Sequence, residues 1–301
     1  ENQRNCGRST SRVGETVKNF IIITNRTKDK ELQVTNRIRD YLTAHGAECI
    51  VEEELPEEGS GYTEAGCVPE NTECAIVLGG DGTMLQAAID LIDTEIPLVG
   101  INLGTLGFLS EVNRNDLETS LDQLLSDHFE IEQRMMLSGS VYSGTKQKET
   151  FQALNDIVIT RRGSLQINSY NIFVNEKHLH CYHADGILVA TPTGSTGYNL
   201  SAGGPIVNPC ARLMVLTPIC PHSMQNRSIV FSAEDQIRIE VEERREPVPA
   251  GGIEVIFDGG HQITLNAGDR VEIVHSEKTT GIIKLHKESF LEILNKKLGE
   301  S

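Results

Sequence analysis

Residues 75–90 read AIVLGGDGTMLQAAID, and this stretch decides the fold. The short apolar run Ala75–Leu78 is typical of a buried strand, and it ends in the glycine-rich turn 79–82. Met84–Asp93 continues with the spacing of a helix. Glycines in such a turn let a ligand approach the main chain closely. Neither GxxxxGK[ST] nor GxGxxG follows a strand here, so the turn matches neither the P-loop nor the dinucleotide fingerprint.

The flanking sequence repeats this alternation of strands and helices. Further strands are predicted at Phe20–Ile23, Ala47–Val51 and Pro97–Ile101, and further helices at residues 29–45 and around Leu117, Leu121 and Leu124. Strands that alternate with helices over residues 17–130 predict an α/β domain with a mostly parallel sheet, covered on both faces.

Around residue 131 the pattern changes to consecutive strand-like runs, among them Met136–Tyr142, Ala153–Thr160 and Asn168–Val174. Residues 131–280 therefore predict an all-β domain of two packed sheets. For residues 281–301 we expect a C-terminal strand and helix that pack back on the first domain. Residues 1–16 are polar and lack periodicity, and we expect a disordered arm or tag there.

Composition excludes several classes of partner. The 301 residues include 27 Lys and Arg and 43 Asp and Glu, which gives a formal charge of −16. This acidic balance argues against nucleic-acid or anionic-membrane partners. No run approaches the ~18 apolar residues of a membrane-spanning helix. The seven cysteines form no CxxC pair, and this scattered set favours a reducing compartment, so we expect a cytoplasmic protein.

Asp81 is the candidate catalytic residue of the glycine-rich turn. A carboxylate there would repel phosphate, so its presence is explained if it accepts a proton from an attacking hydroxyl or acts through a bridging Mg²⁺. The structural alternative is that Asp81 caps the helix that follows.

A second segment, Thr191–Tyr198, is dense in hydroxyl groups and glycine. Residues 184–211 contain no Lys, Arg or His, so this region would bind a polar ligand through neutral donors and the main chain. Tyr198 offers a face on which a base can stack. The alternative is an ordinary Ser/Thr/Gly surface loop.

Two further polar sites adjoin predicted strands. The pair Asn155-Asp156 interrupts a strand-like run and would match an amide, a purine edge or ribose hydroxyls, or would form a turn just before the strand. Asp185 alone would indicate only an Asp-Gly turn. A zinc site at 178–183 is disfavoured, because a strand would divide its His and Cys side chains between two faces.

Together and in this order, the segments resemble the NAD kinase family. The resemblance rests on Gly79–Thr83, Asn102–Gly104, Leu106–Leu109, Asn155-Asp156, Asp185-Gly186, Thr191–Tyr198 and Gly203–Pro205, and it covers roughly residues 17–298. The GGDGT turn alone also resembles diacylglycerol kinases, sphingosine kinases and 6-phosphofructokinases, whereas the second segment is more particular to NAD kinases.

The resemblance implies an α/β N-terminal and a β-rich C-terminal domain, and transfer of the ATP γ-phosphate to the 2′-hydroxyl of the adenosine ribose of NAD, which forms NADP. It makes Asp81 the candidate general base. The residues that it implies in substrate or nucleotide binding are Gly79, Gly80, Gly82, Phe108, Asn155, Asp156, His183, Asp185, Thr193, Thr196, Gly197, Tyr198 and Ser201.

The sequence departs from the family pattern at several positions. Gly197 stands where Ala is usual, so we expect a slightly looser pocket, and Asp156 stands where many members have Glu. His183 occupies a position that is often more basic. Asp258 is followed by Gly259-Gly260, where the family commonly continues with Gln, so no contact is assigned there.

The implied cofactor is a divalent metal, Mg²⁺, that enters with ATP rather than on protein ligands alone. The implied substrates are NAD and ATP, or polyphosphate, and the implied assembly is a homodimer or homotetramer. Two alternatives remain: a lipid kinase that shares the glycine-rich turn, and a noncatalytic NAD(H)-binding sensor. The first would need an apolar or membrane-facing entrance.

Overall fold

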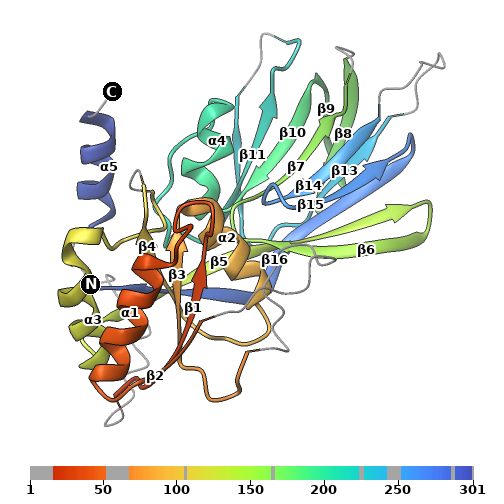
Figure 1. Ribbon diagram of the computed structural model, residues 1–301. Coiled ribbons are helices and arrows are strands. Elements are labelled where there is room, and N and C mark those ends of the chain that lie inside the picture. The colour runs from red at the N-terminus through yellow and green to blue at the C-terminus, as the bar shows by residue number, and fades with distance from the viewer. Residues whose placement is uncertain are drawn as a thin grey trace, which may run out of the picture. The chain divides into compact units, whose positions relative to one another are not determined.

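The computed structural model describes residues 16–51, 68–104, 107–163, 167–223, 227–242, 252–285 and 289–299. The expected arm at residues 1–16 therefore lies outside the described residues, apart from Thr16. These described residues form two compact units, one from the ranges within 1–134 and 279–301 and the other from those within 135–278 (Figure 1). Strands β5 (Glu130–Ser143) and β16 (Asp269–Lys284) run from one unit into the other.

The first unit is built on a parallel sheet with strand order β2-β1-β3-β4. Its strands are β1 (Asn19–Thr24), β2 (Glu48–Val51), β3 (Cys74–Gly79) and β4 (Leu98–Asn102). Beyond β4 the end of β16 joins in parallel, where Ile282 pairs with Leu98. Every residue of β3 and β4 is buried, as expected for strands covered on both faces.

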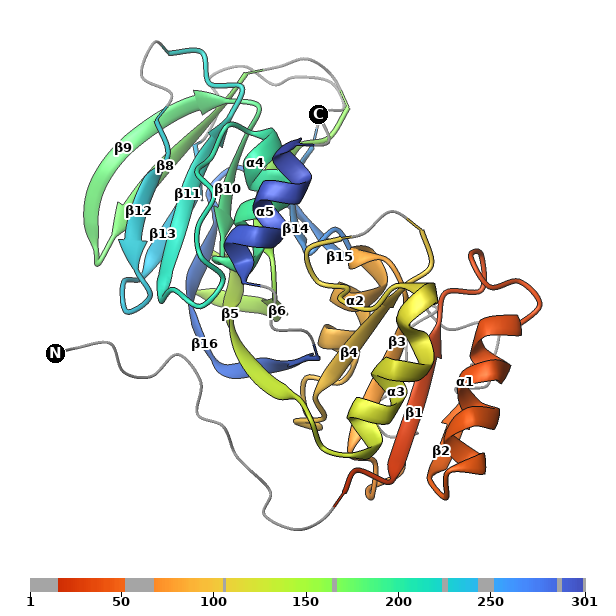
Figure 2. The same cartoon turned by 90° about the vertical axis from the view of Figure 1, so that its left-hand side faces the viewer.

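Helices cover both faces of this sheet. On one face, α1 (Gln33–Ala44) and α3 (Leu117–Leu125) lie side by side, and Tyr41 donates a hydrogen bond to Asp122 at 2.7 Å (Figure 2). Both helices bury leucines against alternate residues of the strands. On the other face lies α2 (Asp81–Asp90), whose Met84 packs against Gly100 of β4. The described part of this unit also contains a 3₁₀ turn, η2 (Arg114–Asp116), and α5 (Phe290–Gly299). The predicted covered, parallel α/β fold is confirmed.

In its described residues, the second unit consists of β-strands and short helices. One sheet has the order β12-β11-β10-β7-β14-β15, and every pairing in it is antiparallel. Its strands are β7 (Asp156–Arg161), β10 (Gly186–Ala190), β11 (Leu213–Ile219), β12 (Ile229–Ser232), β14 (Ile253–Phe257) and β15 (His261–Leu265). The other strands are β6 (Lys146–Ala153), β8 (Asn168–Val174), β9 (Lys177–Ala184) and β13 (Ile237–Val241), with the adjoining parts of β5 and β16.

The two sets of strands share one apolar core, to which Ile157, Ile239 and Val255 contribute, and this confirms the predicted all-β architecture. The prediction of one strand over Ala153–Thr160 was wrong. Ala153 ends β6, a bend follows at Leu154 and Asn155, and β7 begins at Asp156.

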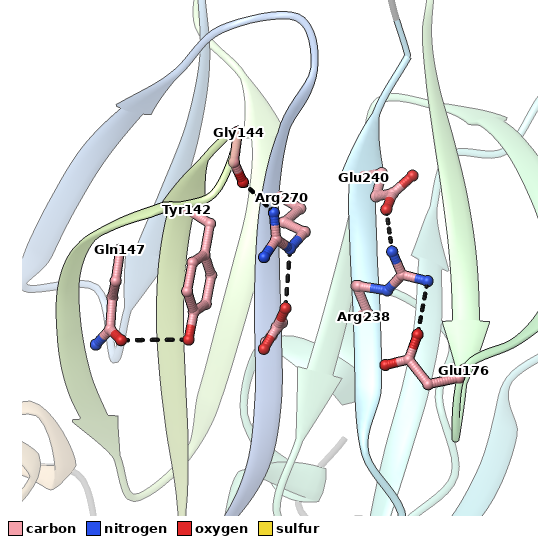
Figure 3. Close-up of polar contacts among 8 residues, drawn as sticks. Tyr142, Gly144, Gln147, Glu176, Arg238, Glu240 and Arg270 are labelled. Carbon is pink, nitrogen blue, oxygen red and sulfur yellow. Dashed lines mark hydrogen bonds and ion pairs between the residues drawn. The ribbon is translucent and has the colours of Figure 1, made fainter.

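Charged side chains on β13 and β16 pair with their own neighbours (Figure 3). Arg238 pairs with Glu240 and with Glu176 at 3.1 Å, and its guanidinium lies 4.1 Å from the centre of the Phe173 ring. Arg270 pairs in the same way with Glu272 at 2.8 Å. Because both arginines already have anionic partners, neither offers a ligand an unneutralised charge.

Among the described residues, no helix combines the length and apolarity needed to cross a membrane.

Candidate active site

The glycine-rich turn connects β3 directly to α2. Gly79 ends the strand, Gly80 is the N-cap residue in an extended conformation, and the helix begins at Asp81. Packing requires the first glycine, because a Cβ on Gly79 would lie 2.2 Å from Oγ1 of Thr83. The first turn of α2 leaves N–H groups without intrahelical acceptors, and they point out of the start of the helix.

The Asp81 carboxylate bonds to the main chain of a distant segment. It accepts the backbone N–H of Phe108 at 2.8 Å and that of Leu109 at 3.1 Å, and the Ser110 hydroxyl lies 3.4 Å away. The alternative that Asp81 caps α2 is wrong, because Gly80 is the N-cap and no side chain caps this helix. Gly107 has no room for a side chain, since a Cβ there would lie 1.7 Å from Oδ1 of Asp81.

Phe108, predicted from the resemblance as a binding residue, is thus held at the start of α2 by its own N–H. The ring of Phe108 also lies 4.7 Å from Nζ of Lys297, on α5. Leu106, which belongs to the same motif, lies outside the described residues.

In the second unit, Asn155 and Asp156 stand at the entrance of β7, and both are held by Asp258, a residue to which sequence reasoning gave no role. The Asp258 carboxylate accepts three successive backbone N–H groups, those of Leu154, Asn155 and Asp156, at 2.6, 2.8 and 2.9 Å. Asp258 adopts φ +47°, a strained value for a residue with a side chain. The only sequence signal was the turn composition of Asp258-Gly259-Gly260.

Burial governs the charge of this carboxylate pair. Burial and the nearby charge of Asp258 raise the pKa of Asp156 to about 7. Burial also raises the pKa of Asp258, to about 6, although the three N–H donors oppose that rise. Asp156 is only 6% exposed, and Oδ1 of Asn155 is buried without a hydrogen-bond partner. The site therefore presents a protonatable carboxyl group and an unsatisfied amide oxygen.

The hydroxyl-rich segment folds as two short helices, η3 (Thr193–Thr196) and α4 (Tyr198–Ser201), that follow β10. It packs on the Asn155 turn, because Thr191 donates its hydroxyl to the Leu154 carbonyl at 2.6 Å. A Cβ on Gly194 would lie 2.1 Å from the Asn155 carbonyl oxygen. The surface-loop alternative is wrong, since Thr191, Thr193, Ser195 and Asn199 are all buried.

Gly197 faces the same pair of side chains. A Cβ there would lie 3.3 Å from Nδ2 of Asn155 and 4.0 Å from Oδ2 of Asp156. It would also lie 3.3 Å from the Gly194 carbonyl oxygen, so a methyl group here would be crowded, and glycine lets the backbone approach this pair closely. Tyr198 follows with 46% of its surface exposed, which leaves its ring accessible for stacking.

The other predicted residues of this segment lie as follows. Thr193 has a buried hydroxyl without a hydrogen-bond partner, Thr196 donates to the Thr193 carbonyl at 3.3 Å, and Ser201 is exposed at the end of α4. The segment thus combines an unsatisfied buried hydroxyl with an exposed hydroxyl and ring.

Asp185 is paired with Arg161, which sequence reasoning also missed. Nε and a terminal nitrogen of Arg161 contact the two Asp185 oxygens at 3.0 and 3.2 Å. His183 is exposed on β9 and shares a hydrogen bond with the Ser169 hydroxyl on β8 at 2.9 Å. The two residues therefore have separate partners, although they are close in sequence.

Across the described part of the chain, no group of three or more His, Cys, Asp or Glu side chains is arranged to hold a metal ion.

Both halves of this chain are similar in sequence to domains of known proteins. Residues 20–129 match the ATP-NAD kinase N-terminal domain, and residues 154–285 match the ATP-NAD kinase C-terminal domain. The NAD kinase of Lachnospira eligens is 43% identical over 293 residues, which cover 94% of this chain and 100% of that protein. The NAD kinase of Agathobacter rectalis is 45% identical over 289 residues, which cover 94% of this chain and 99% of that protein.

Two solved structures share the fold. Yeast NADH kinase complexed with NADH matches with a TM-score of 0.79 and 25% identity, and the match covers 95% of this chain and 88% of that one. An Archaeoglobus fulgidus NAD kinase in complex with ATP matches with a TM-score of 0.73 and 25% identity, covering 92% of this chain and 98% of that one.

Proposed function

This chain belongs to the NAD kinase family, and we propose that Asp81 is the general base that activates the 2′-hydroxyl of the adenosine ribose of NAD for attack on the γ-phosphate of ATP. The activity is that of an NAD kinase, a phosphotransferase with an alcohol acceptor, and the product is NADP. A ribose hydroxyl is a weak nucleophile, and a positioned base typically contributes about 10²–10⁴-fold to the rate.

The observation that carries this proposal is the anchoring of the Asp81 carboxylate at the glycine-rich turn. The N–H groups of Phe108 and Leu109 each bond to a different oxygen of the carboxylate. A carboxylate oxygen has about two lone-pair positions. Oδ1 accepts both the Leu109 N–H and the Ser110 hydroxyl, whereas Oδ2 accepts only the Phe108 N–H, so Oδ2 keeps a position free to accept a proton. The two bonds fix the orientation of the group before substrate arrives, as positioning of a base requires.

For the acceptor NAD, we propose a site on the second unit formed by Asn155, Asp156, Thr193, Gly197 and Tyr198. Three observations support it: the unsatisfied Oδ1 of Asn155 and hydroxyl of Thr193, the close approach of the Gly197 backbone to the Asn155 and Asp156 side chains, and the exposed ring of Tyr198. These groups can pair with the polar edges of adenosine and stack on its base.

For the remaining predicted contacts we propose supporting roles. His183 and Asp185 would contact the polar groups of NAD beyond the adenosine, with Arg161 orienting Asp185, and Thr196 and Ser201 would contact its ribose. Mg²⁺ would enter on the ATP phosphates and neutralise part of their charge.

We also propose a cytoplasmic location and a homodimer or homotetramer. The five cysteines in the described part of the chain, Cys49, Cys74, Cys181, Cys210 and Cys220, are free thiols, which favours a reducing compartment. Light scattering coupled to size exclusion would measure the assembly.

The experiment that tests the function is incubation of the purified protein with NAD and Mg-ATP, with NADP quantified by an NADP-specific dehydrogenase. NADH, polyphosphate and a diacylglycerol acceptor form the comparison arms. NADP formation that requires both substrates is the expected result. NAD binding without turnover would instead identify a sensor, and phosphorylation of the lipid alone would identify a lipid kinase.

A further inference from the structure

Three glycines around the glycine-rich turn have open sides that neither packing nor backbone conformation explains. A Cβ on Gly82 would meet nothing within 4 Å. Among the described residues, a Cβ on Gly80 or Gly104 would meet only Nζ of Lys28, at 3.0 and 3.7 Å, respectively. Gly80 has φ −128°, a value that any residue adopts. These glycines therefore leave main chain accessible on one side, and at Gly80 and Gly104 the described neighbour on that side is the Lys28 ammonium.

The structure fixes the backbone of Lys28 next to this turn. Its N–H bonds to the Asn25 carbonyl at 3.0 Å, and the Asn25 N–H bonds to the Leu78 carbonyl of β3 at 2.8 Å. The Asn25 side chain also donates to Oγ1 of Thr83, in the first turn of α2, at 3.2 Å. The loop that carries Lys28 is thus anchored to both elements that the glycine-rich turn connects.

The charge of Lys28 is not neutralised by its acidic neighbours. Asp29 is turned toward the start of α1, where it accepts the N–H and the hydroxyl of Thr35 at 2.9 and 2.8 Å. Asp81 is turned toward the N–H groups of residues 108 and 109. Within the ranges that the structure describes, Lys28 forms no ion pair, and its side chain is exposed.

We propose that Lys28 binds the phosphate chain of the phosphoryl donor, which approaches the open main chain at Gly80 and Gly104. This inference rests on the proposed kinase function and assigns the donor, rather than NAD, to this part of the first unit. A lysine acts on phosphate as a compact point charge with three donors. A Cβ at position 80 would lie 3.0 Å from Nζ of Lys28, so the ammonium would have to shift to make room for it.

The test compares Lys28→Met with Lys30→Met, which removes the same charge from a neighbouring exposed residue of the same loop. For Lys28→Met we expect the KM for ATP to rise about 10-fold or more, with the KM for NAD within twofold of wild type. Calorimetry with inorganic tripolyphosphate should show a similar loss of affinity, and this binding measurement does not depend on turnover. We expect Lys30→Met to match wild type, and Lys28→Arg, which keeps the charge, to retain most of the affinity. Thermal unfolding would verify that each variant is folded.

The outcomes separate this inference from the proposed function. Equal tripolyphosphate affinity and equal KM for ATP in Lys28→Met and wild type would overturn the role of Lys28 while leaving the kinase function intact. A change in the KM for NAD alone would also overturn it. A wild-type protein that binds tripolyphosphate through Lys28 but forms no NADP would support the inference about Lys28 and contradict the proposed reaction.

Discussion

The carboxylate of Asp81 accepts the backbone N–H of Phe108 at 2.8 Å, across 27 residues of sequence. This bond joins the glycine-rich turn to the segment that follows β4. The same carboxylate therefore has a structural contact in the free protein and, in our proposal, a chemical role in the reaction. A useful variant must distinguish the two.

We expect Asp81→Asn to lower kcat by about 10²-fold or more and to leave the KM for NAD within a few-fold of wild type. The amide keeps one acceptor oxygen, so one of the two N–H bonds is lost, and the free energy of unfolding should fall by about 1–3 kcal/mol. The control is Ser110→Ala, which removes only the 3.4 Å contact to Asp81 and should keep wild-type kcat. Steady-state kinetics and urea unfolding measure both quantities. If Asp81→Asn kept wild-type kcat, the carboxylate would serve only to hold the segment 107–110.

We expect Gly82→Ala to separate stability from activity. Gly82 lies in the first turn of α2, and a Cβ on it would meet nothing within 4 Å, so alanine is accommodated there. Alanine in a helix is favoured over glycine by up to about 1 kcal/mol. The variant should therefore unfold at an equal or higher temperature, and its kcat/KM for ATP should fall because the methyl group obstructs the donor. Calorimetric melting and initial rates would measure this, and wild-type kcat/KM would show that no ligand approaches Gly82.

Asp156→Asn should stabilise the free protein in a pH-dependent manner. The folded protein raises the pKa of Asp156 from 3.8 to about 7, so the folded state holds a proton that the unfolded chain has released. That contribution to stability is fully present below about pH 4 and is lost as the pH rises through 7. An amide at this position does not titrate. The free energy of unfolding of the variant should therefore exceed that of the wild type by an amount that grows with pH, to a few kcal/mol by about pH 8. Urea unfolding at pH 4.5, 6 and 8 measures it, and a difference independent of pH would mean that Asp156 ionises normally.

Whereas Asp156→Asn should stabilise the protein, we expect Asp258→Asn to weaken the hydrogen bonds that hold the Asn155 turn. Asparagine tolerates the positive φ of this position, so the backbone need not change. Its single acceptor oxygen cannot serve all three N–H groups of residues 154–156, and the affinity for NAD should fall about 10-fold. Loss of the neighbouring charge should also lower the pKa of Asp156, because that charge is one of the two causes of its rise. Calorimetry of NAD binding across pH would report both effects, and unchanged affinity would remove Asp258 from the positioning of this turn.

Arg161→Met should raise the KM for NAD several-fold, because Asp185 loses the partner that fixes both of its oxygens. A double-mutant cycle with Asp185→Asn measures the coupling, which we expect at about 0.5–3 kcal/mol for residues in direct contact. The matched control is Arg162→Met, which removes the adjacent charge and should leave the KM for NAD unchanged. Additive effects of the two changes would show that the ion pair does not position Asp185.

Most of the element order could be predicted from the sequence, and the misses have physical explanations. Strand β6, KQKETFQA, has no apolar alternation because most of its side chains are exposed. Strand β9, KHLHCYHA, likewise exposes most of its residues. Helix α1 begins at Gln33 rather than near residue 29, because Leu32 adopts a left-handed conformation and Asp29 bonds to the N–H groups of the first turn. Hydrophobic periodicity in the sequence reflects which side chains are buried, so it does not reveal a strand that buries few of its side chains.

Only part of the candidate site could be predicted from the sequence. The motifs located Asp81, Asn155, Asp156 and the segment 191–198, since glycines and polar residues between apolar runs are visible locally. The partners of these residues were not visible. Asp258 was marked only by the turn composition of residues 258–260, and Arg161 and Lys28 had no local signal, because a single charged residue at a strand end or in a loop is ordinary in any sequence.

By itself, therefore, the sequence determined the local elements, the α/β to all-β division and the positions of the glycine-rich and hydroxyl-rich segments, because propensity and burial patterns act over a few neighbouring residues. Only the tertiary structure decided which groups meet. The bonds from Asp81 to Phe108, from Asp258 to Asn155 and from Asp185 to Arg161 span 27, 103 and 24 residues. Each depends on the order and register of the strands, and hydrogen bonds of a few ångströms between such distant residues leave no trace in a local pattern.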